Sequence, residues 1–289
     1  MDDGIVDDGM VDDGMVDDGI GDAIIEVRGI SVSFGGLTAV ADLDFAVPRG
    51  AIKAVIGPNG AGKTTLFNVI SGVQAPSSGR VLLAGEDVTA TAAHERVQRG
   101  LARTFQNLQV FSGMSVLENV VVGMHTRLKS GVFNALLRLP SGRREEVQAR
   151  DKARALLGRV GLAAKADLPV SALSFGDLKI VEIARALASE PKVLLLDEPT
   201  AGLPAAEAGR VAEVIRAINA EGVTVLLVEH NMRVVMAISH DILVLNFGRR
   251  IAEGEPAVVR AHPEVIAAYL GTDAEAQRMN DGAVGTAHV

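Results

Sequence analysis

The sequence predicts an α/β fold: a parallel sheet covered by helices, joined to an antiparallel β subdomain and an inserted helical subdomain. Three observations predict it. A glycine-rich segment, residues 57–65, lies between a strand-like run and a helix-like run. Three apolar runs, at 193–197, 223–229 and 242–245, are separated by helical patterns, as in parallel sheets covered on both faces. Near the N-terminus, short apolar and alternating runs favour antiparallel strands.

Residues 1–22 form an acidic repeat of Asp-Asp-Gly followed by apolar residues. They carry nine Asp and no basic residue. Clustered like charges and frequent glycine cannot bury enough surface to fold, so we expect a disordered tail. Without it, the net charge of −8 becomes about +1 for the remaining 267 residues. The ordered part therefore has no basic field of the kind that indicates a nucleic-acid partner.

The chain contains no Cys, which excludes disulfides, thiolate catalysis and Cys-ligated metal sites. No stretch approaches the roughly 18 consecutive apolar residues of a membrane span. The acidic N-terminus also lacks the basic and apolar regions of a secretory signal. We therefore expect any work at a membrane to go through partner chains.

Order is expected to begin near Ala23. Strand patterns at 24–27, 31–34, 43–47 and 80–85 predict the antiparallel subdomain around the glycine-rich segment. From about 98 to 185 the pattern becomes mainly helical, which we interpret as an inserted helical subdomain. The main domain is expected to span 23–271, with a last helix at Glu264–Leu270, and residues 272–289 are expected to form a flexible tail.

The glycine-rich segment fits G-x-x-x-x-G-K-[ST], the phosphate-binding loop of nucleotide triphosphatases. Its residues are the candidate nucleotide ligands: Gly57, Pro58, Asn59, Gly60, Ala61, Gly62, Lys63, Thr64 and Thr65. The glycines let backbone N–H groups turn inward, and the following helix N-terminus favours an anion. Lys63 is expected to reach the β- and γ-phosphates, and the Thr64 hydroxyl to ligate Mg²⁺. The sequence therefore predicts a nucleotide site.

Two consecutive carboxylates, Asp197 and Glu198, end the apolar strand 193–197. At the carboxyl end of a strand beside the phosphate loop, Asp197 can hold Mg²⁺ and Glu198 can polarise an attacking water. In isolation the pair would be an ordinary acidic turn; the phosphate loop is what favours the catalytic interpretation.

Three further positions carry no decisive signal by themselves. Ser174, before the helical run 178–187, needs no role beyond an N-cap. Gln106 and His230 would each be taken for surface polar residues.

Taken together, these motifs follow the order and spacing of the ATP-binding cassette (ABC) ATPases, which the chain resembles from about Ile24 to Gly271. The resemblance implies a P-loop NTPase (RecA-like) core and assigns roles. Phe34, 29 residues before Lys63, would stack on adenine. Gln106 would contact Mg²⁺ and the lytic water, His230 would hold the γ-phosphate, and Glu198 would be the base. Ser174 and Gly176 would close over the nucleotide of a second ATPase subunit.

A narrower resemblance is to the ATPases of branched-chain amino acid importers. It rests on the segments Phe34–Val40, Arg103–Gln106, Thr200–Leu203, Asn246–Gly254 and His262–Gly271. It implies hydrolysis of MgATP at the cytoplasmic face of the cell membrane, as a peripheral protein. The implied partners are a second ATPase subunit (an identical copy or a paralogue), two integral membrane permease subunits and, indirectly, a solute-binding protein.

The alternatives are an importer ATPase for another small solute, such as urea or amides, a soluble ABC ATPase without a transport role, and a non-hydrolysing regulatory cassette. The last is suggested by departures from the family pattern. Asp177 stands where the signature motif has Gln, Ile180 where Arg is common, and Pro204-Ala205 where Asn-Pro is typical. Asp177 is expected to bring an anion near a polyanionic ligand and to weaken contacts with the second subunit.

Overall fold

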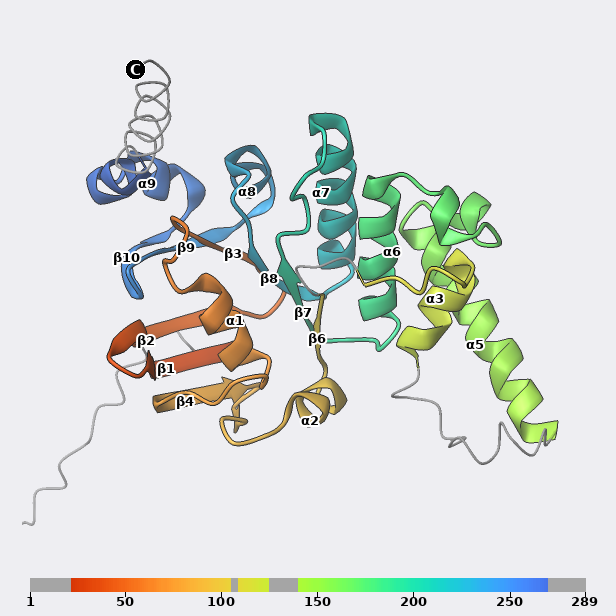
Figure 1. Ribbon diagram of the computed structural model, residues 1–289, viewed down its shortest axis with the longest axis horizontal. Coiled ribbons are helices and arrows are strands. Elements are labelled where there is room, and N and C mark those ends of the chain that lie inside the picture. Colours follow the sequence, from red (N-terminus) through yellow and green to blue (C-terminus); the bar gives the residue numbers. More distant parts are fainter. Residues whose placement is uncertain (1–21, 105–108, 125–139, 270–289) are drawn as a thin grey trace, which may run out of the picture.

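A computed structural model describes residues 22–104, 109–124 and 140–269, with the side chains of α5 (Pro140–Arg159) from Glu145 onward. Figure 1 shows two sheets on one side and a group of helices on the other. Residues 1–21 and 270–289, which hold all of the predicted tails (1–22 and 272–289) except Asp22, lie outside the described residues, as does Gln106. In the described part of the chain, no helix is long and apolar enough to cross a bilayer.

The central sheet has six strands in the order β10-β9-β3-β8-β7-β6, and the five from β9 to β6 are parallel. Every residue of β3, β7 and β8 is buried, as expected for strands covered on both faces. The strands are β3 (Ile52–Ile56), β6 (Leu101–Arg103), β7 (Val193–Asp197), β8 (Thr224–Val228), β9 (Asp241–Asn246) and β10 (Arg249–Gly254).

The second sheet is antiparallel, with the order β2-β1-β4-β5. Its strands are β1 (Ala23–Phe34), β2 (Leu37–Pro48), β4 (Ser78–Leu83) and β5 (Glu86–Asp87). One hydrophobic cluster joins it to the central sheet through α1 (Lys63–Ile70), whose Leu66 and Phe67 are fully buried. The expected antiparallel subdomain is present, with β1 as one long strand where two short ones were predicted.

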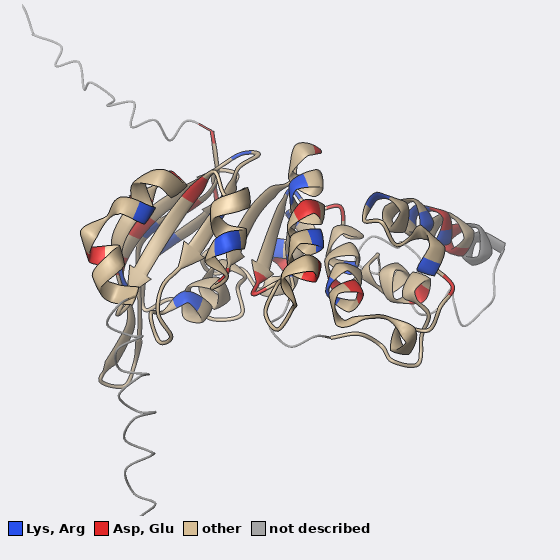
Figure 2. Ribbon diagram, turned by 90° about the horizontal axis from the view of Figure 1, so that it is seen from above, with Lys and Arg blue, Asp and Glu red and all other residues tan. Residues whose placement is uncertain are grey.

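The other helices are α2 (Ala93–Gln98), α3 (Val116–Gly123), α5, α6 (Phe175–Leu187), α7 (Ala205–Ala220), α8 (Met232–Ile238) and α9 (Pro256–Ala261), followed by a helical segment at 263–269. Figures 1 and 2 agree that α3 and α5 lie beyond α6, at the end away from the antiparallel sheet. Within the range predicted to be helical, β6 instead adds to the edge of the central sheet beside β7, and the helical part follows it.

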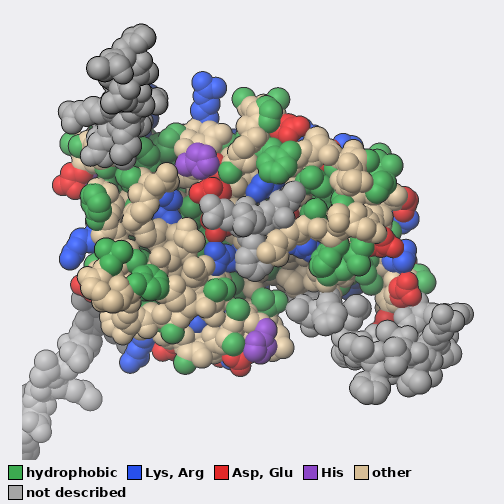
Figure 3. All heavy atoms as spheres, viewed as in Figure 1, with side chains coloured by type: hydrophobic (Ala, Val, Ile, Leu, Met, Phe, Trp, Pro, Cys, Tyr) green, Lys and Arg blue, Asp and Glu red, His purple; other side chains and the backbone are tan. Residues whose placement is uncertain are grey.

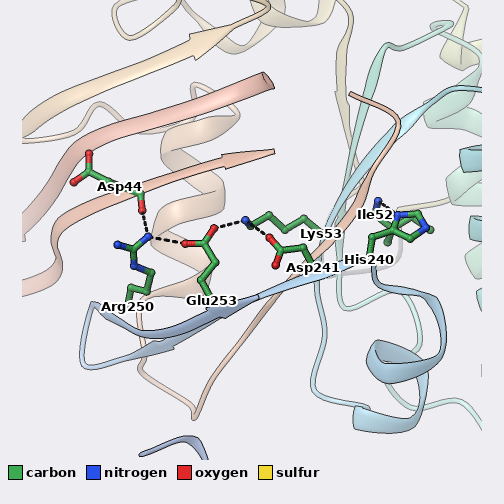
Figure 4. A network of polar contacts seen from close by, with 7 residues as sticks. All are labelled: Asp44, Ile52, Lys53, His240, Asp241, Arg250 and Glu253. Carbon is green, nitrogen blue, oxygen red and sulfur yellow. Dashed lines mark hydrogen bonds and ion pairs between the residues drawn. The ribbon is translucent and has the colours of Figure 1, made fainter. Parts of the chain in front are cut away.

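A network of charged side chains fixes β3 from its N-terminal end (Figure 4). Lys53, 1% exposed, bonds to Asp241 of β9 at 2.5 Å and to Glu253 of β10. Arg250 then joins Glu253, at 2.6 Å, to the backbone carbonyl of Asp44 in β2, at 3.0 Å. Because a buried cation is stable only when paired, this network ties the C-terminal hairpin to the strand that carries the phosphate loop.

Candidate functional site

The phosphate loop connects β3 to α1 in a conformation that only glycine allows at two points. Gly57 has φ +148°, and a Cβ there would lie 2.1 Å from the Leu245 carbonyl oxygen. Gly62 has φ +99°, and its Cβ would lie 2.4 Å from the Ala39 carbonyl oxygen. Both contacts are shorter than any van der Waals distance, so β2 and β9 press directly on the loop. These contacts hold the loop at the N-terminus of α1, where the positive end of the helix dipole favours an anion.

Lys63 lies at the start of α1 and turns its ammonium back over the loop. Its Nζ donates to the carbonyls of Gly57 at 2.6 Å and Pro58 at 2.9 Å. Burial lowers the pKa of Lys63, and the nearby Glu198 and Asp197 carboxylates oppose that shift. The cation is therefore bonded to the loop and near enough to the two acids to feel their charge.

Arg96 of α2 supports α1 from its other end. This side chain is 1% exposed, and its guanidinium donates to the last carbonyls of α1, Val69 and Ile70, at 2.7 Å each. Cations at a helix C-terminus satisfy unpaired carbonyls and complement the dipole. Arg96 is thus a structural partner of the phosphate loop that the sequence pattern did not single out.

Asp197 ends β7 with its side chain 2% exposed, and it is paired with Arg103 at the end of β6, at 2.8 Å. The same guanidinium donates to Asn68 Oδ1 and Ser71 Oγ, both at 2.8 Å. Arg103 therefore joins the predicted metal ligand to α1. From the sequence alone, Arg103 is noted only within the segment Arg103–Gln106. The one feature that could have identified it is a cation three residues before Gln106.

Glu198 and His230 lie close together. They follow the neighbouring strands β7 and β8, and His230 Nδ1 lies 4.0 Å from Glu198 Oε2. Glu198 has φ +50°, a strained value for a side-chain-bearing residue, and its N–H donates to Val228 O at 2.9 Å. The Glu198 side chain is 25% exposed and the His230 side chain 60% exposed, so solvent reaches both groups.

Glu229, between Val228 and His230, is a buried acid that sequence reasoning did not identify. It is 1% exposed and accepts a hydrogen bond from the Thr200 hydroxyl at 2.5 Å. Its Oε2 has no hydrogen-bond partner among the described residues. Burial raises the pKa of Glu229, despite the hydrogen bond from Thr200. The residue links the turn after Glu198 to the turn that carries His230.

The signature segment, residues 173–177, lies at the start of α6. Ser174 is an N-cap, as its pattern alone suggested, and its Oγ accepts from the Asp177 N–H at 3.2 Å. The Gly176 N–H donates to Glu207 Oε2 at 2.9 Å. Phe175 remains half exposed beside them.

The structure corrects the expectation for Asp177. Its carboxylate is 2% exposed and paired with Lys165 and, at 2.8 Å, with Arg210. Burial alone would raise the pKa of Asp177, but hydrogen bonds from these two cations outweigh it and lower the pKa. The extra negative charge is neutralised within the chain and is not presented to a ligand.

The predicted residues thus fall into two groups. The phosphate loop, Asp197, Glu198 and His230 gather around the carboxyl ends of β3, β7 and β8. Ser174 and Gly176 form no hydrogen bond to the phosphate loop in the part of the chain that the structure describes. Phe34, half exposed, ends β1.

The family profile described as ABC transporter matches residues 40–201, which include the phosphate loop, the signature segment and both strand-end acids. The chain belongs to the ABC transporter family. A second profile, described as branched-chain amino acid ATP-binding cassette transporter, matches residues 249–275. The ABC resemblance inferred from the motifs is therefore confirmed, and the protein is an ATP-binding cassette ATPase.

Relatives and solved structures cover nearly the same span. The chain is 41% identical over 249 residues to the high-affinity branched-chain amino acid transport ATP-binding protein LivG of Escherichia coli, covering 86% of this chain and 98% of LivG. Identity to BraF of Pseudomonas aeruginosa, with the same descriptive name, is 40% over the same shares. The ADP conformation of the ABC transporter cassette MJ1267 matches with a TM-score of 0.76 and 33% identity, covering 86% of this chain and 99% of that one. The predicted fold class is confirmed.

Proposed function

We propose that this ABC ATPase powers import of branched-chain amino acids through a membrane permease. One observation carries the proposal: similarity to LivG and BraF extends over 98% of their length. The C-terminal profile match at 249–275 supports it, because that segment lies outside the matched ABC transporter region. Leucine, isoleucine and valine are therefore the expected solutes, carried by a separate binding protein.

In the proposed reaction the protein residues hold MgATP and activate water. The loop N–H groups and Lys63 would bind the β- and γ-phosphates, and Phe34 would stack on adenine. Thr64 and Asp197, with Gln106, would hold Mg²⁺, whose oxygen ligands they match and whose charge would neutralise the phosphates. Glu198 would take a proton from the attacking water. His230, whose Nδ1 lies 4.0 Å from Glu198 Oε2, would orient the γ-phosphate.

A groove supports coupling to a permease. It has a volume of about 550 Å³ and is lined by residues of β6, α3, α6 and the segment 109–111, among them Ala102, Val110, Phe111, Val122 and Ala186. Apolar grooves of this kind accept a helix from a partner. We propose that a cytoplasmic helix of one permease subunit docks here, and that the second permease subunit docks on the second ATPase subunit. The protein would then lie peripherally at the cytoplasmic face of the membrane.

The second ATPase subunit would complete the site with its own signature segment. Ser174 and Gly176 lie at a helix N-terminus, which favours an anion, but on a different element from the phosphate loop. A nucleotide bound by one chain would therefore be closed in by Ser174 and Gly176 of another copy or a paralogue. On the face of the molecule drawn in Figure 3, basic, acidic and apolar side chains are mixed, and no basic field favours nucleic acid.

The test is to reconstitute the chain with its permease subunits in vesicles and add solute-binding proteins one at a time. ATP turnover that rises only with a leucine-, isoleucine- or valine-loaded binding protein supports the proposal. Stimulation by a urea- or amide-loaded protein would show another importer, and stimulation by nucleic acid would show a soluble ATPase. Lys63→Ala should abolish nucleotide binding, while the exposed control Lys152→Ala should not.

A further inference from the structure

The start of α6 is held by two side chains from one face of α7, which lies beside it (Figure 1). The first is Glu207, whose Oε2 accepts from the Gly176 N–H at 2.9 Å. A Cβ at position 176 would lie 2.6 Å from the same oxygen, so a side chain there would displace the Glu207 carboxylate. The carboxylate therefore satisfies one of the unpaired N–H groups at the beginning of α6.

The second side chain is Arg210, one turn further along α7. It donates to Asp177 Oδ1 at 2.8 Å, while Lys165 pairs with the other oxygen. Asp177 is almost fully buried, whereas the side chains of Arg210 and Lys165 are 48% and 40% exposed. The acid is therefore fixed in the interior, and the cations reach it from the surface.

These contacts attach the signature segment to the catalytic strand of the same chain. α7 begins at Ala205, seven residues after Glu198, and the turn between them is held by the bond from Thr200 to Glu229. Residues 199–204 connect Glu198 to α7, and the first two of them, Pro199 and Thr200, are buried. From α7 the two contacts lead directly to Gly176 and Asp177.

We propose that Glu207 and Arg210 form a clamp that positions the signature segment and couples it to the catalytic end of β7. The clamp consists of these two residues of α7 acting on Gly176 and Asp177 of α6. It rests on the proposed role of the signature segment, which is to close over the nucleotide of a second subunit. Two contacts of opposite charge, one on an N–H and one on a carboxylate, fix both the position and the rotation of the helix start.

Amide hydrogen exchange of the full-length chain tests the clamp. Glu207→Ala removes the acceptor for Gly176, so exchange in a peptide covering 174–178 should quicken about tenfold, the factor expected for one lost charged hydrogen bond. Glu207→Gln keeps an acceptor and should stay within about threefold of the parent protein. The interior of α6, residues 181–187, should not change in either variant. Unchanged exchange at 174–178 in Glu207→Ala would overturn the proposal.

Turnover tests the coupling. In the permease-bound assembly, Arg210→Gln should lower kcat for ATP about fivefold or more and leave KM unchanged, since the phosphate loop is intact, and Arg210→Lys should restore most of it. Arg154→Gln, which breaks an exposed ion pair with Asp167, is the control and should alter neither. Loss of kcat that lysine does not restore, or an equal rise in KM, would show a purely structural role. The exchange result does not depend on the solute, so failure of the import proposal and failure of the clamp are separable.

Discussion

The phosphate-loop end and the signature end of the predicted site are held in place by different kinds of contact. At the phosphate-loop end, β2 and β9 press on Gly62 and Gly57 and the loop is shaped by backbone contact. At the signature end, the N–H of Gly176 is already bonded to Glu207, and Asp177 is held by Arg210 and Lys165. The first end is built by close packing of backbone, and the second by charged side chains, two from α7 and one, Lys165, from the turn before α6.

The difference shows that the two ends respond to different kinds of change. A loop shaped by steric contact tolerates no added atom but needs no particular side chain around it. A helix start held by ion pairs tolerates a changed residue when partners for it are present. Asp177, which stands where the signature usually has Gln, is accommodated in this way, because Lys165 and Arg210 neutralise it.

The largest expected effect is at the catalytic strand end. Glu198→Gln should retain ATP binding and lower turnover roughly 10²–10⁴-fold, the range for a general base. The measurement is single-turnover hydrolysis of bound ATP, with the exposed Glu213→Gln on α7 as control. Near-normal turnover of Glu198→Gln would remove this residue from the role.

The second prediction concerns the buried pair behind the phosphate loop. Arg103→Gln leaves Asp197 buried without its cation and should lower the free energy of unfolding by roughly 3–5 kcal/mol. Urea unfolding measures it. Arg154→Gln breaks a pair that is more than half exposed and should cost less than about 1 kcal/mol. Equal costs for the two variants would contradict a special role for the buried pair.

Much of the fold could be predicted from the sequence because its signals are local. The buried strands β3, β7, β8 and β9 are mostly apolar runs, and the phosphate loop is a contiguous motif. Asp197 and Glu198 could be placed beside the phosphate loop because the carboxyl ends of parallel strands meet at one edge of a sheet. The site roles of Phe34, Gln106, Ser174, Gly176 and His230 came from family resemblance alone and stay predictions.

The remaining features depend on contacts between residues far apart in the chain. Glu207 bonds to a residue 31 positions away, and Arg103 to one 94 positions away, and neither pattern is visible locally. β6 is only three residues long, too short for a periodic signal between helical stretches. Glu229 was overlooked because an acid at the end of a strand reads as exposed until its surroundings are known.

The third prediction tests the charged end directly. Asp177→Asn should lower the free energy of unfolding by about 1–3 kcal/mol at pH 7, less than Arg103→Gln, because Lys165 and Arg210 can turn to water. The pKa of Asp177 is lowered in the folded protein, so its contribution is complete above the ordinary value of 3.8 and is lost as pH falls through the folded pKa. The deficit of the variant should therefore shrink in acid. A deficit that is the same at pH 7 and at the lowest pH where the protein stays folded would contradict the ion pairing.

Glu229 supplies the opposite case and the smallest effect. Its pKa is raised in the folded protein because burial disfavours the charged form, so the folded state keeps a proton that the unfolded chain releases above about 4.5. Stability of the parent protein should fall as pH rises from there through the folded pKa. Glu229→Gln cannot ionise, so its stability relative to the parent should rise over that interval, by about 1 kcal/mol for each pH unit fully crossed. The pH dependence of this stability difference reports only the ionisation of Glu229, because any cost of the new amide beside Thr200 is the same at every pH. Urea unfolding of both proteins at intervals from pH 4 to pH 8 measures it, and a difference that stays flat would show that the Glu229 carboxyl is solvated like an ordinary surface acid.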